Sequence, residues 1–231
     1  LENHHDAEEW QAFTNALTTN LTSFFREEHH FPILAEHLAK MAVSKHSKPI
    51  RIWCSASSTG EEPYSIAITA CEAFNTLKPP VEIIATDIDT NVLSTAAAGI
   101  YPIDRIKKMD ERRVRQFFEK GTGSHDGMVR IKKAVRELIT FRQLNLLDSD
   151  WLIREQFDAI FCRNVMIYFD KPTQSKIIDK FTQLMHEETL LFAGHSENFL
   201  YVSDQLQLLG KTVYKLKTNG AARASTFLNR K

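Results

Sequence analysis

The sequence predicts an α/β fold with a mostly parallel sheet, and three observations lead to this prediction. Short apolar segments of strand length follow one another from Pro49 onward: "PIRIWCSA", "VEIIATDID", "ELITFRQLNLL", "FDAIFCRNV" and "TLLFAGHS". Helical segments lie between several of them, at about 63–77, 90–98 and 172–186. This alternation is typical of a parallel sheet with helices on both faces. With 231 residues and an apolar fraction of 43%, the chain has the size of one such domain plus a small insertion.

Three further segments complete the predicted architecture. Residues 8–45 show helical spacing in "EEWQAFTNALTTNLTSFF" and "FPILAEHLAKMAV" and predict N-terminal helices. Residues from about 100 to 138 interrupt the alternation with a short helix, a Gly-rich turn and the strand "MVRIK", which predicts a small antiparallel insertion. "QLQLLGKTVYKLK" predicts a hairpin that closes the sheet. We therefore expect an N-terminal helical segment at 1–45, a main domain at 46–217 and a C-terminal tail at 218–231.

Composition narrows the class of protein. Lys plus Arg equal Asp plus Glu at 29 each, so the net charge points to neither nucleic acid nor a membrane as a partner. No apolar run approaches the ~18 residues of a membrane span, and no signal-peptide pattern is present. Cys54, Cys71 and Cys162 lie in apolar segments without metal-ligand spacing, which predicts reduced core thiols in a cytoplasmic protein. Because the chain begins at Leu1 without Met, we expect a fragment whose upstream part was removed.

The loop "SASSTGEEP" follows the first strand, at the edge of the sheet where doubly wound folds bind ligands. Its small side chains let a ligand approach the backbone, and Pro63 fixes the first helical turn. Glu61 and Glu62 lie at the helix N-terminus, so a pyrophosphate there would meet two like charges. A ligand with an ammonium or sulfonium centre suits this loop better. The alternative is that both glutamates only complement the helix dipole.

Two other strand ends carry polar residues. Asp87 directly follows an apolar run, where an acidic residue typically accepts hydrogen bonds from ribose hydroxyls, and Asp89 is expected to cap the next helix. Arg163 and Asn164 follow the buried strand of "FDAIFC", and polar groups there are costly unless they are paired. They predict a functional site or, alternatively, a structural ion pair of Arg163 with a carboxylate such as Glu61.

Three features together fit S-adenosylmethionine: an acid that can bind the ribose, a loop without a phosphate cradle, and acids placed to lie near the cationic amino acid part of the ligand. The sulfonium methyl group of this cofactor is already activated, so an enzyme mainly has to align a nucleophile behind it. The loop after "FDAIFC" contains neither an Asn/Asp-Pro-Pro-aromatic tetrapeptide nor a Pro-Cys pair. This disfavours methylation of base amino groups or of cytosine C5.

Six blocks, in order, resemble the chemotaxis receptor glutamate methyltransferases, the CheR family: "TTNLTSFFRE", "SSTGEEPYSIA", "TDIDTNVL", "NLL", "FCRNVMIYFD" and "LLFAGHSENF". The resemblance extends from about Trp10 to Leu216. It implies a Rossmann-like class I S-adenosylmethionine methyltransferase fold, with N-terminal helices and a small antiparallel β-subdomain at the insertion. It also implies methyl transfer to glutamate side chains on the cytoplasmic helices of chemoreceptors, which yields methyl esters and S-adenosylhomocysteine.

The resemblance also implies residue roles. Arg26 and Tyr168 are expected to lie nearest the transferred methyl group. The turn with Gly121 and Gly123 is similar to the loop with which some members bind a receptor's C-terminal tail peptide, and edge-strand addition is the expected mode. The family's usual N-terminal helical domain is mostly missing here, so full receptor affinity is not expected. Cofactor contacts are expected at Asn20, Thr22, Arg26, Glu62, Asp87, Asn145, Leu146, Arg163 and Asn164.

The expected chemistry needs no general base, because a glutamate side chain with a pKa of about 4.3 is already a carboxylate at neutral pH. Arg26 either steers that carboxylate or holds the carboxylate of the cofactor, and Tyr168 either hydrogen-bonds the acceptor or walls the sulfonium. We expect a cytoplasmic monomer that binds neither nucleic acid nor a membrane.

Several simpler interpretations compete with these. His29 and His30 are expected to be surface or packed side chains rather than metal ligands, and no metal site is predicted. His195 is expected to have a structural role at its strand end. A methyltransferase acting on small molecules or nucleic acids, and a non-catalytic sensor of S-adenosylmethionine, are the alternative functions.

Overall fold

The computed structural model describes residues 15, 20–45 and 48–217. The N-terminal part of the predicted helical segment and the tail at 218–231 lie outside the described residues. In chain order the main elements are α2 (His30–Lys45), β1 (Ile50–Cys54), α3 (Glu61–Ala73), β2 (Val81–Asp87), α4 (Thr90–Ala98), β6 (Ile139–Gln143), β7 (Phe157–Cys162), η3 (Met166–Tyr168), α7 (Lys171–Gln183), β8 (Met185–Ala193), η4 (Phe199–Tyr201), β9 (Leu206–Gly210) and β10 (Val213–Leu216).

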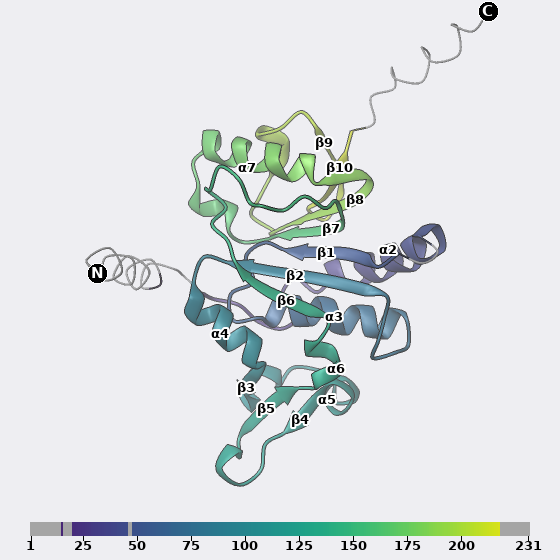
Figure 1. Cartoon of the computed structure of the whole chain (residues 1–231), viewed down its shortest axis with the longest axis vertical. Helices are drawn as coiled ribbons and strands as arrows, with labels where there is room; N and C mark the ends of the chain where they lie inside the picture. The colour runs from purple at the N-terminus through teal and green to yellow at the C-terminus, as the bar shows by residue number, and fades with distance from the viewer. Residues whose placement is uncertain (1–14, 16–19, 46–47, 218–231) are drawn as a thin grey trace, which may run out of the picture.

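The main sheet has seven strands in the order β6-β2-β1-β7-β8-β10-β9. The pairs β1–β2, β1–β7, β2–β6 and β7–β8 are parallel, and β10 is antiparallel to both β8 and β9. The predicted mostly parallel sheet and closing hairpin are confirmed (Figure 1). Because the chain proceeds from β1 to one side and later returns to β7 on the other, the strand order reverses between these two strands, where such folds bind ligands.

Two apolar cores lie on the two faces of this sheet. Ile50 and Ile52 of β1 pack with the apolar residues of α2 and α3, whereas Trp53 of the same strand packs with α7. The alternation follows from the two-residue period of side chains along a strand. Every residue of β7 is buried, as expected for a central strand covered on both sides. The predicted apolar segments therefore form a sheet whose central strands β1 and β7 are buried between two cores, whereas its outer strands β6 and β9 are partly exposed.

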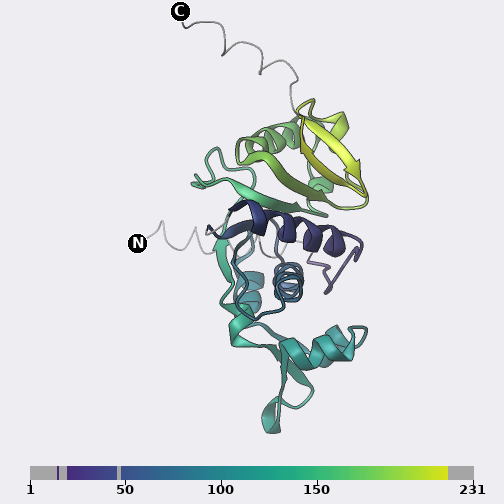
Figure 2. The same ribbon diagram turned by 90° about the vertical axis from the view of Figure 1, so that its right-hand side faces the viewer.

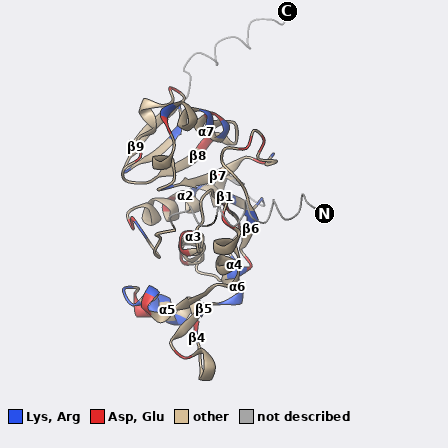
Figure 3. Ribbon diagram, turned by 90° about the vertical axis from the view of Figure 1, so that its left-hand side faces the viewer, with Lys and Arg blue, Asp and Glu red and all other residues tan. Residues whose placement is uncertain are grey.

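The predicted insertion forms a separate small sheet. It contains β3 (Ile100–Pro102), η1 (Ile103–Ile106), α5 (Glu111–Phe117), β4 (Phe118–Lys120), η2 (Gly123–His125), β5 (Met128–Ile131) and α6 (Lys133–Arg136). Its strand order is β3-β5-β4, and both pairs are antiparallel. This β-subdomain projects from the end of the molecule opposite α7 and the β9–β10 hairpin (Figures 1 and 2). Charges of both signs are mixed along α5 and α7 (Figure 3).

The continuous helical character predicted up to residue 45 is wrong for residues 20–29, which form an extended stretch and a turn before α2 begins at His30. Phe25 and Glu27 have φ angles of 53° and 54°, and a right-handed helix cannot contain such residues. Among the described residues, no helix is both long and apolar enough to cross a membrane. The three cysteines are buried free thiols, as predicted.

Candidate active site

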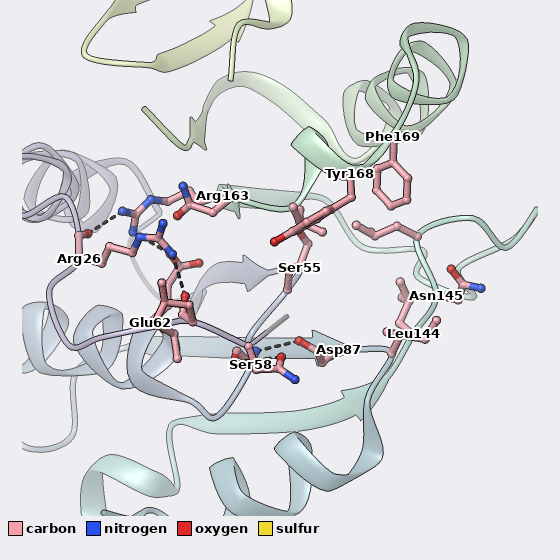
Figure 4. Close-up of a pocket in the computed structure, with 18 of the residues that line it drawn as sticks. Arg26, Ser55, Ser58, Glu62, Asp87, Leu144, Asn145, Arg163, Tyr168 and Phe169 are labelled. Carbon is pink, nitrogen blue, oxygen red and sulfur yellow. Dashed lines mark hydrogen bonds and ion pairs between the residues drawn. The ribbon is translucent and has the colours of Figure 1, made fainter. Parts of the chain in front are cut away.

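A pocket of about 370 Å³ opens at the carboxyl ends of β1, β2 and β7. It is closed on one side by residues 20–26, which precede α2, and on another by η3 (Figure 4). All ten residues predicted from the sequence as cofactor contacts or catalytic groups line this pocket: Asn20, Thr22, Arg26, Glu62, Asp87, Asn145, Leu146, Arg163, Asn164 and Tyr168. Gly121 and Gly123 lie elsewhere, in the turn between β4 and β5 of the β-subdomain.

Asp87 ends β2 at one end of the pocket, and its carboxylate is held by the backbone. The amide of Ser58 donates to Oδ2 at 2.8 Å, and the amide of Asp89 donates to Oδ1 at 3.1 Å. Burial raises the pKa of Asp87, although these two N–H groups act in the opposite direction. Asp89 caps α4 as predicted, because its side chain accepts from the amides of the first helical turn. Asp87 therefore presents a fixed, dehydrated acceptor to the pocket.

An ion pair forms the opposite end of the pocket. Arg163 Nη1 donates to Glu62 Oε2 at 2.7 Å, and the Arg163 side chain is only 1% exposed. Its Nη2 donates to the backbone carbonyl of Arg26 at 2.5 Å and lies 3.5 Å from Glu27 Oε2. Burial raises the pKa of Glu62, and Arg163 opposes that rise. Two carboxylates thus hold one guanidinium beside the loop that precedes α3.

The predicted alternative that pairs Arg163 with Glu61 is wrong. Glu61 is fully buried and lies 3.2 Å from Nη2 of Arg105, while it also accepts a hydrogen bond from the Thr59 hydroxyl at 2.6 Å. Nη1 of Arg105 donates to the backbone carbonyl of Thr22 at 3.2 Å. Since Glu61 and Glu62 are adjacent on a helix, their side chains point in directions about 100° apart and reach different partners. Glu61 ties the β-subdomain to the pocket, and Glu62 faces the pocket.

The tight loop before α3 requires glycine at its last position. Gly60 has a φ of 99°, and an added Cβ would lie 2.8 Å from both the Ala96 side chain and the Tyr101 hydroxyl. That hydroxyl donates to the carbonyl of Thr59 at 2.7 Å, so a residue of the β-subdomain helps to fix the loop. The loop provides no side-chain cap for α3, and Glu61 and Glu62 occupy the first helical turn instead. The predicted absence of a phosphate cradle agrees with this geometry, since an anion there would meet the Glu62 carboxylate.

One organising residue lies in the block "LLFAGHSENF" but was given no role from the sequence: Glu197, only 5% exposed, in the segment after β8. Its Oε1 accepts from the amides of Val165 at 2.9 Å and Met166 at 2.8 Å. Its Oε2 accepts from the amides of Asn164 at 2.9 Å and Gly194 at 2.5 Å. A single carboxylate therefore fixes the loop that carries the pocket residues after β7.

Gly194 allows this arrangement, because an added Cβ would lie 2.5 Å from the Asn164 amide nitrogen Nδ2 and 2.7 Å from Glu197 Oε2. Asn164 itself has a φ of 57° and donates through Nδ2 to Glu27 Oε1 at 3.2 Å. Phe25, Glu27 and Ser58, which also have positive φ angles, lie in the other segments around the pocket. Such strained positions cluster at functional sites, where the surrounding structure holds them in place.

Tyr168 and Arg26 lie at the open wall of the pocket. Tyr168 is 60% exposed and points into the pocket from η3 (Figure 4). The Arg26 guanidinium donates from Nη1 to the carbonyl of Leu21 at 2.9 Å and has no carboxylate partner among the described residues. The Tyr168 side chain and the remaining N–H groups of Arg26 can therefore contact a ligand that enters through the open side of the pocket.

The pocket suits a ligand with an adenosine and an amino acid at its two ends. Asp87 offers the acceptor that ribose hydroxyls need, and apolar contacts are available from Ile88, Leu144 and Leu146. Glu62 and Arg163 offer complementary charges for an ammonium and a carboxylate. These residues fit S-adenosylmethionine, whose bound sulfonium supplies an activated methyl group.

Known proteins are similar to this chain in sequence over nearly its whole length. Residues 20–215 match the family described as "CheR methyltransferase, SAM binding domain". Chemotaxis protein methyltransferase 2 of Pseudomonas aeruginosa is 54% identical over 213 residues, covering 91% of this chain and 75% of that protein. The chemotaxis protein methyltransferase of Salmonella typhimurium is 48% identical over 221 residues, covering 96% and 75%, and that of Escherichia coli 47% over 216 residues, covering 94% and 74%.

Among solved structures, a TehB-like SAM-dependent methyltransferase from Corynebacterium glutamicum superimposes with a TM-score of 0.43 at 10% identity, covering 93% of this chain and 96% of that one. A similarity of this size carries no weight, and the assignment rests on the sequence matches. The chain belongs to the CheR methyltransferase family and contains its S-adenosylmethionine-binding domain.

Proposed function

We propose that this protein transfers the methyl group of S-adenosylmethionine to glutamate side chains of chemoreceptors, which yields glutamate methyl esters and S-adenosylhomocysteine. One observation carries the proposal: the pocket combines a fixed acid, a buried ion pair and the side chains of Arg26 and Tyr168 at an open wall, and its described lining includes no histidine, cysteine or lysine that could remove a proton. An acceptor that is already a carboxylate at neutral pH needs no such base. The names of the relatives, chemotaxis protein methyltransferases, indicate the same class of substrate.

The cofactor lies across the carboxyl ends of β1, β2 and β7 in this proposal. Asp87 accepts the ribose hydroxyls, and Asn145 and Leu146 contact the base at the same end of the pocket. Glu62 accepts from the ammonium group at the other end, while the hydrogen bond from Arg163 favours the ionised form of Glu62 and opposes the effect of burial on its pKa. Asn20, Thr22 and Asn164 complete the set of contacts at the wall.

The acceptor glutamate enters from the side of Arg26 and Tyr168. Arg26 lies beside the ion pair and attracts a carboxylate electrostatically, whereas Tyr168 provides a hydroxyl donor at the open wall. Their main contribution is alignment of the carboxylate oxygen behind the sulfonium methyl group, since proximity and orientation dominate such a displacement. A second contribution is exclusion of water from the reacting groups by the aromatic ring.

The finer assignments are proposals of the same kind. The turn with Gly121 and Gly123 adjoins β4, an outer strand of the small sheet, so a receptor's C-terminal tail peptide adds there as a further strand. Residues 46–217 act as one cofactor-binding domain that contains the β-subdomain. The protein works as a cytoplasmic monomer.

The test is transfer of a labelled methyl group from S-adenosylmethionine to purified chemoreceptor cytoplasmic fragments, followed by mild base. We expect label in the receptor fragment and its release as methanol, because esters are base-labile. Label that survives base contradicts a carboxyl ester. A thermal shift with S-adenosylhomocysteine but no transfer, with an active relative as positive control, contradicts the enzyme and supports a sensor.

A further inference from the structure

Glu27, His29 and His30 form a cluster of metal-ligating side chains immediately before and at the start of α2. One ligand atom from each of them lies within 4.8 Å of the other two. None of the three lines the cofactor pocket, although Glu27 lies 3.5 Å from Nη2 of Arg163, which does. The methyl-transfer chemistry proposed above uses no metal; it gives Glu27 a supporting contact with Arg163 and Asn164 and gives the two histidines no role.

The buried part of the cluster contains two acceptors that face each other. His30 is fully buried, and its Nε2 lies 2.8 Å from the carbonyl oxygen of Lys211. A carbonyl oxygen only accepts, so Nε2 carries the proton and Nδ1 has a lone pair. His30 Nδ1 is 4.0 Å from Glu27 Oε2, and among the described residues neither atom accepts a hydrogen bond, although Glu27 Oε2 is ion-paired with Arg163 Nη2 at 3.5 Å. The buried lone pair of His30 Nδ1 therefore has no donor there, which is unfavourable unless an electron-poor group binds it.

The geometry points to a binding site for a divalent transition-metal ion such as Zn²⁺, with Glu27, His29 and His30 as its three protein ligands. Two imidazoles and one carboxylate are a donor set typical of zinc with one open position. The Nε2–H bond of His30 to a backbone carbonyl is the outer-shell contact that metal-bound histidines almost always make. His29 is partly exposed, its ring centroid lies 4.3 Å from that of His30 with the two ring planes tilted by 58°, and it completes the set from the solvent side.

Binding requires a small closure of the cluster. With Zn–N and Zn–O bonds of about 2.0–2.1 Å, tetrahedral ligands lie about 3.4 Å apart, so the side chains must approach by roughly 1 Å. Rotation of the partly exposed His29 supplies part of this. Arg163 retains Glu62 and the Arg26 carbonyl as partners when Glu27 turns toward the metal, so its guanidinium is not left unpaired. Its positive charge opposes metal binding, and we expect a dissociation constant in the micromolar range.

The experiment uses the full chain after treatment with a chelator, titrated with Co²⁺ as a spectroscopic probe and with Zn²⁺ by calorimetry. We expect one equivalent to bind, with the intense visible absorption of a tetrahedral cobalt centre that Zn²⁺ abolishes. His29→Ala and Glu27→Gln should each weaken binding at least about tenfold. His125→Ala, at an exposed histidine of the β-subdomain, is the matched control and should bind as the parent does. His4→Ala with His5→Ala controls for the other histidine pair in the sequence.

His29→Ala keeps the test independent of folding, because a partly exposed side chain is removed and S-adenosylhomocysteine affinity reports an intact pocket. If the parent protein binds neither Co²⁺ nor Zn²⁺ at one equivalent, the proposal is overturned. A water molecule between His30 and Glu27 is then the remaining explanation of their arrangement. Binding that is unchanged in both His29→Ala and Glu27→Gln overturns it as well, as does binding lost only with His4 and His5.

Discussion

Glu197→Gln tests whether one buried carboxylate organises the pocket loop. Glutamine places an oxygen on one side of the amide and an NH₂ group on the other. If NH₂ takes the place of Oε1, it faces the amides of Val165 and Met166; if it takes the place of Oε2, it faces those of Asn164 and Gly194. Two charge-assisted hydrogen bonds are therefore lost in either orientation, and two buried N–H groups are left without an acceptor.

The magnitude follows from these contacts. A hydrogen bond to a charged group contributes about 1.5–3 kcal/mol, so the loss of two amounts to about 3–6 kcal/mol before the loop relaxes. We take the lower end, about 3 kcal/mol, which for a domain of this size lowers Tm by about 6–12 °C. Because the loop carries Arg163 and Asn164, the affinity for S-adenosylhomocysteine should also fall at least about tenfold, equivalent to about 1.4 kcal/mol.

The assay combines thermal unfolding by circular dichroism with calorimetric titration of S-adenosylhomocysteine, at a temperature where the variant is fully folded. Glu187→Gln, at an exposed position of β8, is the matched control and should leave both quantities unchanged. Glu197→Asp keeps the charge and should recover part of the loss. A Tm within about 2 °C of the parent, together with unchanged affinity, would refute the role given to Glu197.

Four other changes test separate parts of the site. Arg26→Ala should lower methyl transfer by about 10²–10³-fold with little change in Tm, because its backbone carbonyl still accepts from Arg163; turnover equal to that of the parent would contradict its placement beside the methyl group. Glu62→Gln should weaken S-adenosylmethionine binding at least about tenfold. Unchanged affinity would contradict the proposed contact between Glu62 and the ammonium group of the cofactor. Burial raises the pKa of Asp87 above the ordinary 3.8, so cofactor affinity should fall as the pH drops toward this raised pKa, because the protonated acid accepts ribose hydroxyls less well. Asp87→Asn should remove this pH dependence of the affinity. Gly121→Ala should abolish tail-peptide binding without affecting cofactor affinity, because an added Cβ would meet the His125 carbonyl at 2.0 Å; peptide titration measures the first and calorimetry the second.

The regular elements of the main sheet were predictable because they repeat simple patterns. The helix expected at 90–98 is α4, Thr90–Ala98, with Asp89 as its N-cap and Gly99 in the left-handed region at its end. The helix expected at 63–77 begins two residues earlier and ends at Ala73, and the one expected at 172–186 ends at Gln183. Apolar periodicity locates a helix well, whereas its last turn depends on tertiary contacts.

The segment before α2 was mispredicted for a physical reason. Residues 20–29 have apolar side chains at nearly helical spacing, but Phe24 packs edge-on against Tyr101 and Phe118 of the β-subdomain. Phe25 donates its amide to the Ser65 hydroxyl at 2.9 Å instead of continuing a helix. Neither Phe nor Glu is a residue type that favours a positive φ, so the turn at Phe25 and Glu27 could not be predicted from their residue types.

The pocket itself shows what a polar residue at a strand end can and cannot predict. Arg163 and Asn164 had to have partners, because they follow a strand that is buried throughout, and this requirement located the site. The partners come from both ends of the chain: Asn164 reaches Glu27 at a separation of 137 residues and Glu197 at 33. Glu197 meets backbone amides only, and any residue type has an amide, so no pairing of side chains in the sequence points to it. Residue type reveals the need for a partner, while only the fold decides which of the 29 acidic residues supplies it.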